Sequence, residues 1–320
     1  MSRIRALFLG TPEIARFCLQ EMIKDAHFEV VGVVTQPDRP SGRKLQLQPS
    51  PVKQLVQPLG MPIFTPEDIN TDEMLSSLVA LQAEIVVVVA YGQILKNKFL
   101  AAFPNRIVNV HASVLPRWRG AAPIQRALMA GDSETGVCLQ LMVRKLDAGP
   151  ILGVRRFALT EEMNAFDSYK LCEVHGAQLI SIDLMDYMRG NLSAVAQDES
   201  LVTYAKKIEK SEAEMDWRQP AASLHNQVRG LAMGPVAFTT VQDKTLKVHR
   251  TRVSSRSEAA LRPGQVIEAT EKSLLVQCGT GSLDLLELQP ESRAKIHIAE
   301  YLRGYPIKVG DFFGLNKGNV

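Results

Sequence analysis

The chain has 320 residues, of which 46% are hydrophobic and 22% are charged, and its formal net charge is +3. These values lie near the average for globular proteins and exclude a disordered, collagen-like or coiled-coil chain. No apolar run approaches the roughly 18 residues of a membrane-spanning helix, and we expect neither a signal peptide nor a membrane partner. The length favours two domains over one.

The cysteines bear on the cellular compartment of the protein, and the charge distribution bears on the class of its partner. The four cysteines lie far apart and form no Cys-x-x-Cys pair, so we expect no disulfide framework or zinc site, and a cytoplasmic location. Residues 1–205 carry 20 Lys and Arg against 21 Asp and Glu, whereas residues 206–320 carry 17 against 13. This basic excess is weak evidence for a polyanionic partner of the C-terminal part, and chance variation of surface charge explains it about as well.

Apolar runs alternate with amphipathic segments through the first half of the chain. Strands are predicted over residues 4–9, 29–35, 85–90, 107–110 and 137–143, and a helix follows the first of them. The run 85–90 is almost pure valine, which is typical of a strand buried on both faces. Strands separated by helices predict an α/β, doubly wound, mostly parallel sheet. Because ligands of such sheets bind beyond the carboxyl ends of the strands, we expect functional residues there.

The second half changes in texture. Residues 164–189 predict a helix that Gly190 can cap, and the polar stretch after it predicts a linker. Short strands are then predicted over residues 235–241, 245–253, 264–270, 273–278 and 282–288. This spacing indicates a small C-terminal β-barrel, for which the oligonucleotide-binding type is one option. The expected division is a catalytic domain over 1–189, a linker over 190–207 and a β-barrel domain over 208–320.

Common nucleotide and hydrolase motifs are missing. The sequence has no G-x-G-x-x-G after its first strand, no G-x-x-x-x-G-K-[ST], no H-E-x-x-H and no G-x-S-x-G. A dinucleotide enzyme, a nucleoside triphosphatase, a zinc protease and a serine hydrolase are therefore all disfavoured.

Two short motifs remain as carriers of chemistry. Asn109 and His111 end a predicted strand, and period-two alternation points both to the same side. Asp147 follows the next strand on a Gly-Pro turn. An amide donor beside an imidazole can stabilise charge on a carbonyl oxygen, and a carboxylate can orient the imidazole, which together suggest direct acyl-type transfer. By spacing alone, a structural histidine and an ordinary turn aspartate explain the pattern at least as well.

A family resemblance favours the catalytic interpretation. Residues 111–123, H-A-S-V-L-P-R-W-R-G-A-A-P, together with L-D-A-G-P at 146–150, resemble the formyltransferases that use 10-formyltetrahydrofolate. Further markers, among them F-L-G-T-P at 8–12 and T-Q-P-D-R-P at 35–40, extend the likeness over nearly the whole chain. The match is closest to members that formylate initiator methionyl-tRNA.

The resemblance implies a role for each matching position. It implies a catalytic trio of Asn109, His111 and Asp147. It implies contacts with the folate co-substrate from Ser113, Val114, Leu115, Pro116, Ala90, Tyr91 and Gly92. It implies contacts with the acceptor end of the tRNA from Arg39, Arg43 and Lys44. We accordingly expect 10-formyltetrahydrofolate as co-substrate, no metal, initiator methionyl-tRNA as partner of a β-barrel that lies along it, and a monomer.

Two departures and two rival functions stand beside this interpretation. The loop after Arg43 and Lys44 continues as L-Q-L-Q and is less basic than in most relatives, and A-M-G stands at 232–234 where the family usually has Asn-Pro-Trp. The main rival is a folate-dependent formyltransferase acting on a small amine, such as an amino sugar nucleotide, which would use the same trio. The other is an RNA-binding protein built on a decayed formyltransferase scaffold, and the intact trio argues against it.

Overall fold

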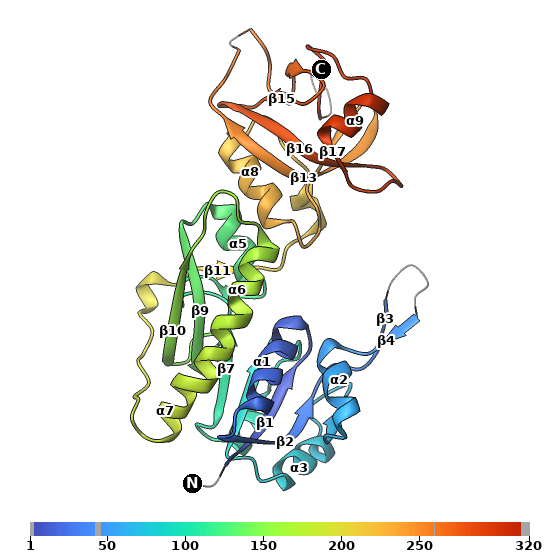
Figure 1. Ribbon diagram of the computed structural model, residues 1–320. Coiled ribbons are helices and arrows are strands. Elements are labelled where there is room, and N and C mark those ends of the chain that lie inside the picture. Colours follow the sequence, from blue (N-terminus) through green and yellow to red (C-terminus); the bar gives the residue numbers. More distant parts are fainter. Residues whose placement is uncertain (1–2, 42–45, 259, 315–320) are drawn as a thin grey trace. The chain divides into compact units, whose positions relative to one another are not determined.

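The computed structural model describes residues 3–41, 46–258 and 260–314. Contacts within the chain divide it into two units. The first comprises Met1–Pro123, Glu134–Ala158 and Tyr169–Ala205, and the second comprises Ile124–Ser133, Leu159–Ser168 and Lys206–Val320. Each unit contains a large β-sheet of its own (Figure 1).

A seven-stranded sheet forms the centre of the first unit. Its strands are β1 (Ile4–Gly10), β2 (Phe28–Val34), β5 (Ile63–Phe64), β6 (Ile85–Val89), β7 (Ile107–His111), β9 (Glu134–Leu141) and β10 (Ile151–Ala158). Their order is β10-β9-β7-β6-β1-β2-β5. β9 is antiparallel to β7 and β10 to β9, whereas the other neighbours run parallel. This confirms the predicted mostly parallel sheet.

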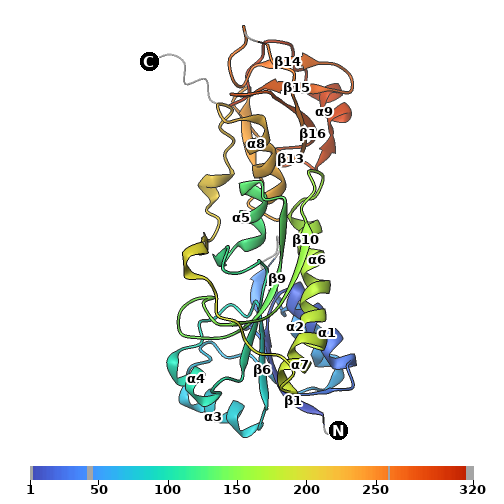
Figure 2. The ribbon, with the colours of Figure 1, turned by 90° about the vertical axis from the view of Figure 1, so that its left-hand side faces the viewer.

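Helices cover both faces of this sheet (Figure 2). On one face lie α1 (Glu13–Lys24), α2 (Pro51–Val56), α6 (Ala165–Gln178) and α7 (Met185–Met188), and on the other lie α3 (Asp72–Ala80) and α4 (Asn97–Ala102). β6 runs through the middle, and all five of its residues are buried. Its valine run is therefore explained by cover on both sides.

Short elements complete the first unit. They are β3 (Arg39–Ser41) and β4 (Gln46–Gln48), which form a hairpin, β8 (Arg119–Gly120) and β11 (Tyr204–Ala205), which pair in parallel, and the 3-10 turns η1 (Gln57–Leu59) and η3 (Glu199–Leu201). The β8–β11 pair matters for the site because it attaches a late segment of the chain to the loop that follows β7.

The structure also departs from the sequence-based expectations. The predicted helix over 164–189 is present as α6, a π-helical stretch η2 (Leu179–Leu184) and α7. The strand expected over 137–143 lies earlier, at β9. β10 was not predicted, because Arg155 and Arg156 interrupt its apolar pattern. The guanidinium of Arg155 reaches Asp183 of the π-helical stretch, with Nη2 2.5 Å from Oδ2, so its charge is compensated.

The second unit contains an antiparallel sheet. Its strands follow the order β12 (Phe238–Val241), β13 (Lys244–Ser254), β16 (Ser282–Pro290), β15 (Leu274–Gln277) and β14 (Val266–Ala269), with β17 (Ile296–His297) beside β16. Its helices are α8 (Ala221–Gly230), α9 (Ile298–Gly304), the 3-10 turn η4 (Lys210–Ala213) and most of α5 (Pro123–Ala130).

A late segment joins the two outer strands of this sheet. The Phe313 N–H donates to the Gly264 carbonyl at 2.8 Å, next to β14, and the Gly314 N–H donates to the Thr240 carbonyl of β12 at 2.7 Å. The Phe313 ring is buried in the core of the unit. Because both edges are satisfied by one segment, the sheet curls into the small β-barrel that the sequence predicts.

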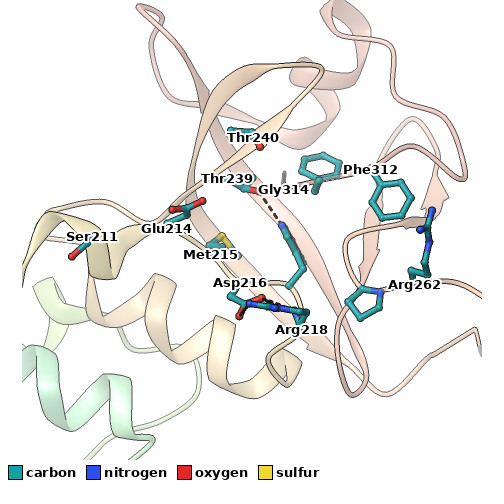
Figure 3. A pocket seen from close by; sticks show the side chains of 13 residues that line it. Ser211, Glu214, Met215, Asp216, Arg218, Thr239, Thr240, Arg262, Phe312 and Gly314 are labelled. Carbon is teal, nitrogen blue, oxygen red and sulfur yellow. Dashed lines mark hydrogen bonds and ion pairs between the residues drawn. The ribbon is translucent and has the colours of Figure 1, made fainter. Parts of the chain in front are cut away.

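A pocket of about 440 Å³ lies beside this closure (Figure 3). The Trp217 indole N–H donates to Thr239 Oγ1 at 2.9 Å, and the Arg218 guanidinium binds Asp216 with Nε 2.8 Å from Oδ1. The Arg262 guanidinium carbon lies 4.8 Å from the centre of the Phe312 ring. These polar groups are thus engaged with groups of the unit itself.

Candidate functional site

β7 presents two of the residues that the sequence singles out. Asn109 pairs in register with Val88 of β6 and with Gln140 of β9, and His111 ends the strand. His111 is 6% exposed, and Asn109 is half-buried. Among the residues that the structure describes, no hydrogen bond engages the Asn109 side-chain amide. A donor is therefore available beside the imidazole at the carboxyl end of the strand.

The imidazole of His111 is oriented by the main chain. Its Nε2 lies 2.9 Å from the Trp118 carbonyl oxygen. Because a carbonyl oxygen only accepts, Nε2 carries a hydrogen. Nδ1 lies 3.7 Å from Oδ2 of Asp147. The ring nitrogen that faces the carboxylate is thus the one that can exchange a hydrogen bond with a reacting group.

Asp147 occupies a tightly held loop after β9. Its Oδ2 accepts the Gly120 N–H at 2.9 Å, and its Oδ1 accepts from Nε2 of Gln140 at 3.1 Å. Its backbone is left-handed, with φ of 47°, a conformation that is uncommon for residues with a Cβ and that aspartate adopts more readily than most. The structure therefore brings His111 and Asp147 together, and both carboxylate oxygens have donors.

Two glycines permit this close approach. A Cβ at Gly120 would lie 2.7 Å from the Ala205 carbonyl oxygen, and one at Gly149 would lie 1.6 Å from the Leu141 carbonyl oxygen. Gly120 also has a φ of 127°, which favours glycine. Side chains at either position would separate the loops that carry His111 and Asp147 from their supports.

The segment expected to bind folate folds back on itself after β7. Ser113 is fully buried, and its hydroxyl donates to the Arg117 carbonyl oxygen at 2.7 Å. The Leu115 N–H donates to Cys138 Sγ at 3.3 Å, and Leu115 is buried. Val114 and Pro116 are half-buried. The Ser113 hydroxyl therefore shapes the loop, which leaves main-chain groups and the sides of Val114 and Pro116 for a ligand.

The turn after β6 has two positive φ angles, 44° at Ala90 and 98° at Gly92. The Tyr91 ring is buried in the hydrophobic core with Leu7, and burial raises the pKa of its phenol. The Tyr91 carbonyl oxygen accepts from Thr11 Oγ1 at 2.7 Å. Ala90 and Gly92 are exposed. The turn can therefore meet a ligand through Ala90 and Gly92, while the Tyr91 side chain anchors it.

Of the residues expected to contact tRNA, the described part of the chain includes Arg39, which lies elsewhere in the first unit. Arg39 begins the β3–β4 hairpin, which extends away from the sheet beside α2 (Figure 1). Its Nη2 lies 2.8 Å from Oε2 of Glu67, and these two side chains are 61% and 71% exposed. Arg43 and Lys44 lie outside the described residues. The structure does not bring Arg39 into the group formed by Asn109, His111 and Asp147.

Among the supports of the site that sequence reasoning missed are Gln140, Gly120 and Gln36. Gln140 is 2% exposed in β9 and donates to Asp147. Gly120 donates its N–H to the same carboxylate, and Gln36 donates from Nε2 to the Tyr91 carbonyl oxygen at 3.2 Å. Of these three, Gln140 could have been found from the sequence, because a glutamine inside an apolar strand is expected to be buried and buried polar side chains normally have a hydrogen-bond partner.

Within residues 3–41, 46–258 and 260–314, no group of three or more His, Cys, Asp or Glu side chains could hold a metal ion. No helix in the described part of the chain is long and apolar enough to cross a bilayer.

Comparison with known proteins places the chain in a family. The formyl transferase model matches residues 2–175, and the model of the formyl transferase C-terminal domain matches residues 207–306. The methionyl-tRNA formyltransferase of Bdellovibrio bacteriovorus is 51% identical over 318 residues, which are 98% of this chain and 100% of that relative. The methionyl-tRNA formyltransferase of Acidithiobacillus ferrooxidans is 42% identical over 310 residues, covering 97% of this chain and 98% of the relative.

A solved structure shares the fold. The N-formyltransferase from Helicobacter canadensis, in complex with folinic acid and dTDP-3-aminofucose, aligns with a TM-score of 0.67. It is 17% identical and covers 90% of this chain and 99% of that one. At this identity the likeness concerns the fold alone. Family membership is decided by the two family-model matches and by the identity to the two methionyl-tRNA formyltransferases. The chain belongs to the formyl transferase family, among the methionyl-tRNA formyltransferases.

Proposed function

We propose that this enzyme transfers the formyl group of 10-formyltetrahydrofolate to the α-amino group of methionine on initiator methionyl-tRNA. The observation that carries the proposal is the 51% identity to a methionyl-tRNA formyltransferase over the whole length of that relative. The identity spans the second unit as well as the first.

The acceptor needs little activation. An α-amine has a pKa of roughly 7.7–8.0 in model compounds, so an appreciable neutral fraction exists near pH 7. The task left to the protein is to hold the reacting groups together and to stabilise the charge that develops on the formyl oxygen.

Asn109 and His111 are suited to that charge. Asn109 offers an uncommitted amide at the end of β7, and the His111 ring is fixed through Nε2 by the Trp118 carbonyl. We assign both as donors to the formyl oxygen, with His111 acting through Nδ1. Such donors act strongly because the site is largely buried and needs no rearrangement during the reaction.

Asp147 is assigned to proton movement and orientation. Its Oδ2 lies 3.7 Å from His111 Nδ1, so the carboxylate can orient the imidazole and can take up the amine proton directly or through water. The donors from Gly120 and Gln140 keep the carboxylate in place while this happens.

The folate is assigned to the loop after β7 and the turn after β6. A flat heterocycle can approach main-chain groups closely at a turn whose exposed residues, Ala90 and Gly92, carry small or no side chains. Val114 and Pro116 would contact the folate from the loop after β7, and the buried Ser113 and Leu115 would act by shaping that loop. Bound there, the folate supplies the formyl group. We propose that the transfer needs no metal.

The tRNA is assigned to the β3–β4 hairpin, through Arg39, Arg43 and Lys44, and to the second unit. The basic excess of residues 206–320 suits a polyanion. We thus keep the division into a catalytic domain over 1–189, a joining segment over 190–207 and a tRNA-binding domain over 208–320. Charged tRNA is a cytoplasmic substrate, so we place the enzyme in the cytoplasm. We also propose that it acts as a monomer.

The test is a formyl-transfer assay with two acceptors. The purified protein receives 10-formyltetrahydrofolate and either charged initiator tRNA or dTDP-3-aminofucose, the amine bound by the Helicobacter canadensis structure. We expect formylmethionyl-tRNA and no formylated sugar. Efficient transfer to the sugar, with none to the tRNA, would assign the protein to small-amine formylation instead.

A further inference from the structure

The segment between α7 and β11 braces both loops of the site. We call residues 191–205 the strap, which is drawn in yellow in Figure 1. Near its start, Val195 exchanges main-chain hydrogen bonds with Ile151, at 2.7 and 2.8 Å, just beyond the Asp147 loop. Near its end, the Thr203 carbonyl accepts the Arg119 N–H at 2.9 Å. The strap is therefore attached to the first residue of β10, directly after the Asp147 loop, and to Arg119 in the loop after β7.

One strap side chain reaches the Asp147 loop itself. Gln197 is half-buried. Its Nε2 donates to the carbonyl oxygens of Asp147 and Gly149, each at 2.8 Å, and lies 3.4 Å from Oε1 of Gln140. Gln140 in turn donates to Oδ1 of Asp147. The main chain and the carboxylate of Asp147 are thus held by two neighbouring amides.

A buried arginine fixes the orientation of that amide. Arg119 is fully buried, and it donates to Oε1 of Gln197 from Nε at 3.1 Å and from Nη2 at 2.7 Å. Arginine is only a donor and a carbonyl oxygen is only an acceptor. The oxygen of the Gln197 amide must therefore face Arg119, and its nitrogen must face Asp147 and Gly149. The amide has no second orientation that satisfies both sides.

The arginine is held by charge as well. Its Nη2 lies 2.8 Å from Oε1 of Glu199, whose Oε2 lies 2.5 Å from Nζ of Lys145. The hydrogen bonds from Arg119 and Lys145 lower the pKa of Glu199 to about 2. Glu199 is thus ionised at any pH suited to the reaction, and the support behind Gln197 stays in place. Lys145 extends it to the start of the Asp147 loop.

This arrangement bears on the reaction because Asp147 is in the left-handed region, with φ of 47°. For a residue with a Cβ, this backbone conformation is less stable than the helical or extended ones, so contacts with the surrounding chain must hold it. We propose that Gln197, oriented by Arg119, is a positioning residue that keeps the Asp147 loop in the conformation that aims its carboxylate at His111. The inference rests on the proposed role of Asp147, and it gives the joining segment a part in catalysis.

The test uses two near-isosteric variants of the full-length enzyme. Gln197→Glu keeps an acceptor for Arg119 but replaces the amide donor with a carboxylate facing two carbonyl oxygens. Gln197→Met removes both functions. We expect each to lower kcat by about tenfold, as two lost hydrogen bonds imply, with the affinity for folate within about twofold of wild type. Ser200→Ala is the matched control, because Asp198 is the hydrogen-bond partner of the Ser200 hydroxyl among the described residues, and it should leave kcat unchanged.

A double-mutant cycle separates positioning from general stability. If Gln197 acts through Asp147, Gln197→Glu should lower single-turnover rates in the Asp147→Asn background by no more than about twofold. An equal loss in both backgrounds would overturn the inference, as would a kcat of either single variant at the wild-type level. Wild-type turnover of Asp147→Asn would instead remove the proposed role of Asp147, which tells the two failures apart.

Discussion

The loops after β7 and β9 and the β3–β4 hairpin belong to the same unit, but they are held in opposite ways. His111 and Asp147 are almost buried, and both oxygens of the carboxylate have donors from other parts of the chain. β4 is exposed throughout, and Arg39 has an exposed carboxylate as its partner. Groups that stabilise a developing charge must be in place beforehand. Cationic side chains that bind phosphates can stay exposed to solvent before binding, because the electrostatic attraction between the opposite charges acts over a distance.

The largest loss of turnover should come from substitutions of Asn109, His111 and Asp147. His111→Ala and Asn109→Ala each remove a donor, for which a loss of about 3 kcal/mol, or hundreds-fold in kcat, is typical. Asp147→Asn keeps the shape but loses the charge, and it should be nearly inactive. Turnover is measured alongside folate affinity, which should hold.

A histidine outside the site provides the control. The His175 ring stacks on Phe157 with ring centres 5.6 Å apart, and His175→Ala should keep wild-type turnover. Near-normal turnover of any of the three site variants would remove that residue from the proposed trio.

The hairpin should show a smaller but specific effect at Arg43. Arginine can bind a phosphate or a base with two hydrogen bonds and can stack on an unpaired base, which lysine cannot reproduce. We expect Arg43→Leu to lower kcat/KM for charged initiator tRNA by about 2–3 kcal/mol. Arg43→Lys should recover part of it.

Measurements at two salt concentrations interpret the Arg43 result. Full rescue by lysine, with a salt slope of binding lower by about one unit in Arg43→Leu, would indicate a plain phosphate contact. A leucine variant within about twofold of wild type would mean that Arg43 does not select tRNA.

Next in size is the support of the carboxylate from Gln140. Gln140→Met keeps the volume but removes the donor to Asp147, and we expect kcat to fall by about tenfold. Gln277 is a matched control, because it is a buried strand glutamine of the second unit, bonded to Ser257. Gln277→Met should lower the melting temperature while sparing kcat. If both variants change stability and neither changes kcat, Gln140 is a structural residue only.

The three residues Asn109, His111 and Asp147 were easier to predict from sequence than the residues that support them. Asn109 and His111 share a strand, and Asp147 follows another, so strand periodicity and the family resemblance were enough to connect them. Gln197 lies 50 residues from Asp147, in a polar stretch without periodicity. Its contact depends on how the chain returns across the sheet, which local patterns do not encode.

The fold shows the same limit. β6 was predictable because two-sided burial selects an unbroken apolar run. β10 was missed because Arg155 is compensated by Asp183, a residue 28 positions later in the sequence. The barrel strands were predicted from turns and alternation, but the segment that joins β12 and β14 was not, because its pairing is made by main-chain groups of Phe313 and Gly314.

The smallest effect concerns the exposed pair of Arg39 and Glu67. An exposed ion pair contributes about 0–1 kcal/mol, so Glu67→Gln should change the free energy of unfolding by less than about 0.5 kcal/mol. The same change frees Arg39 for a phosphate and removes a negative charge from the hairpin side, so tRNA affinity should rise by about two- to fivefold at low salt. Arg39→Gln should lower the salt slope of binding by about one unit.

Glu134→Gln is the matched control, because Glu134 pairs with Arg156 at 2.8 Å with similar exposure at the other edge of the sheet. Equal effects of Glu67→Gln and Glu134→Gln on tRNA affinity would show that overall charge, and not the hairpin, attracts the tRNA.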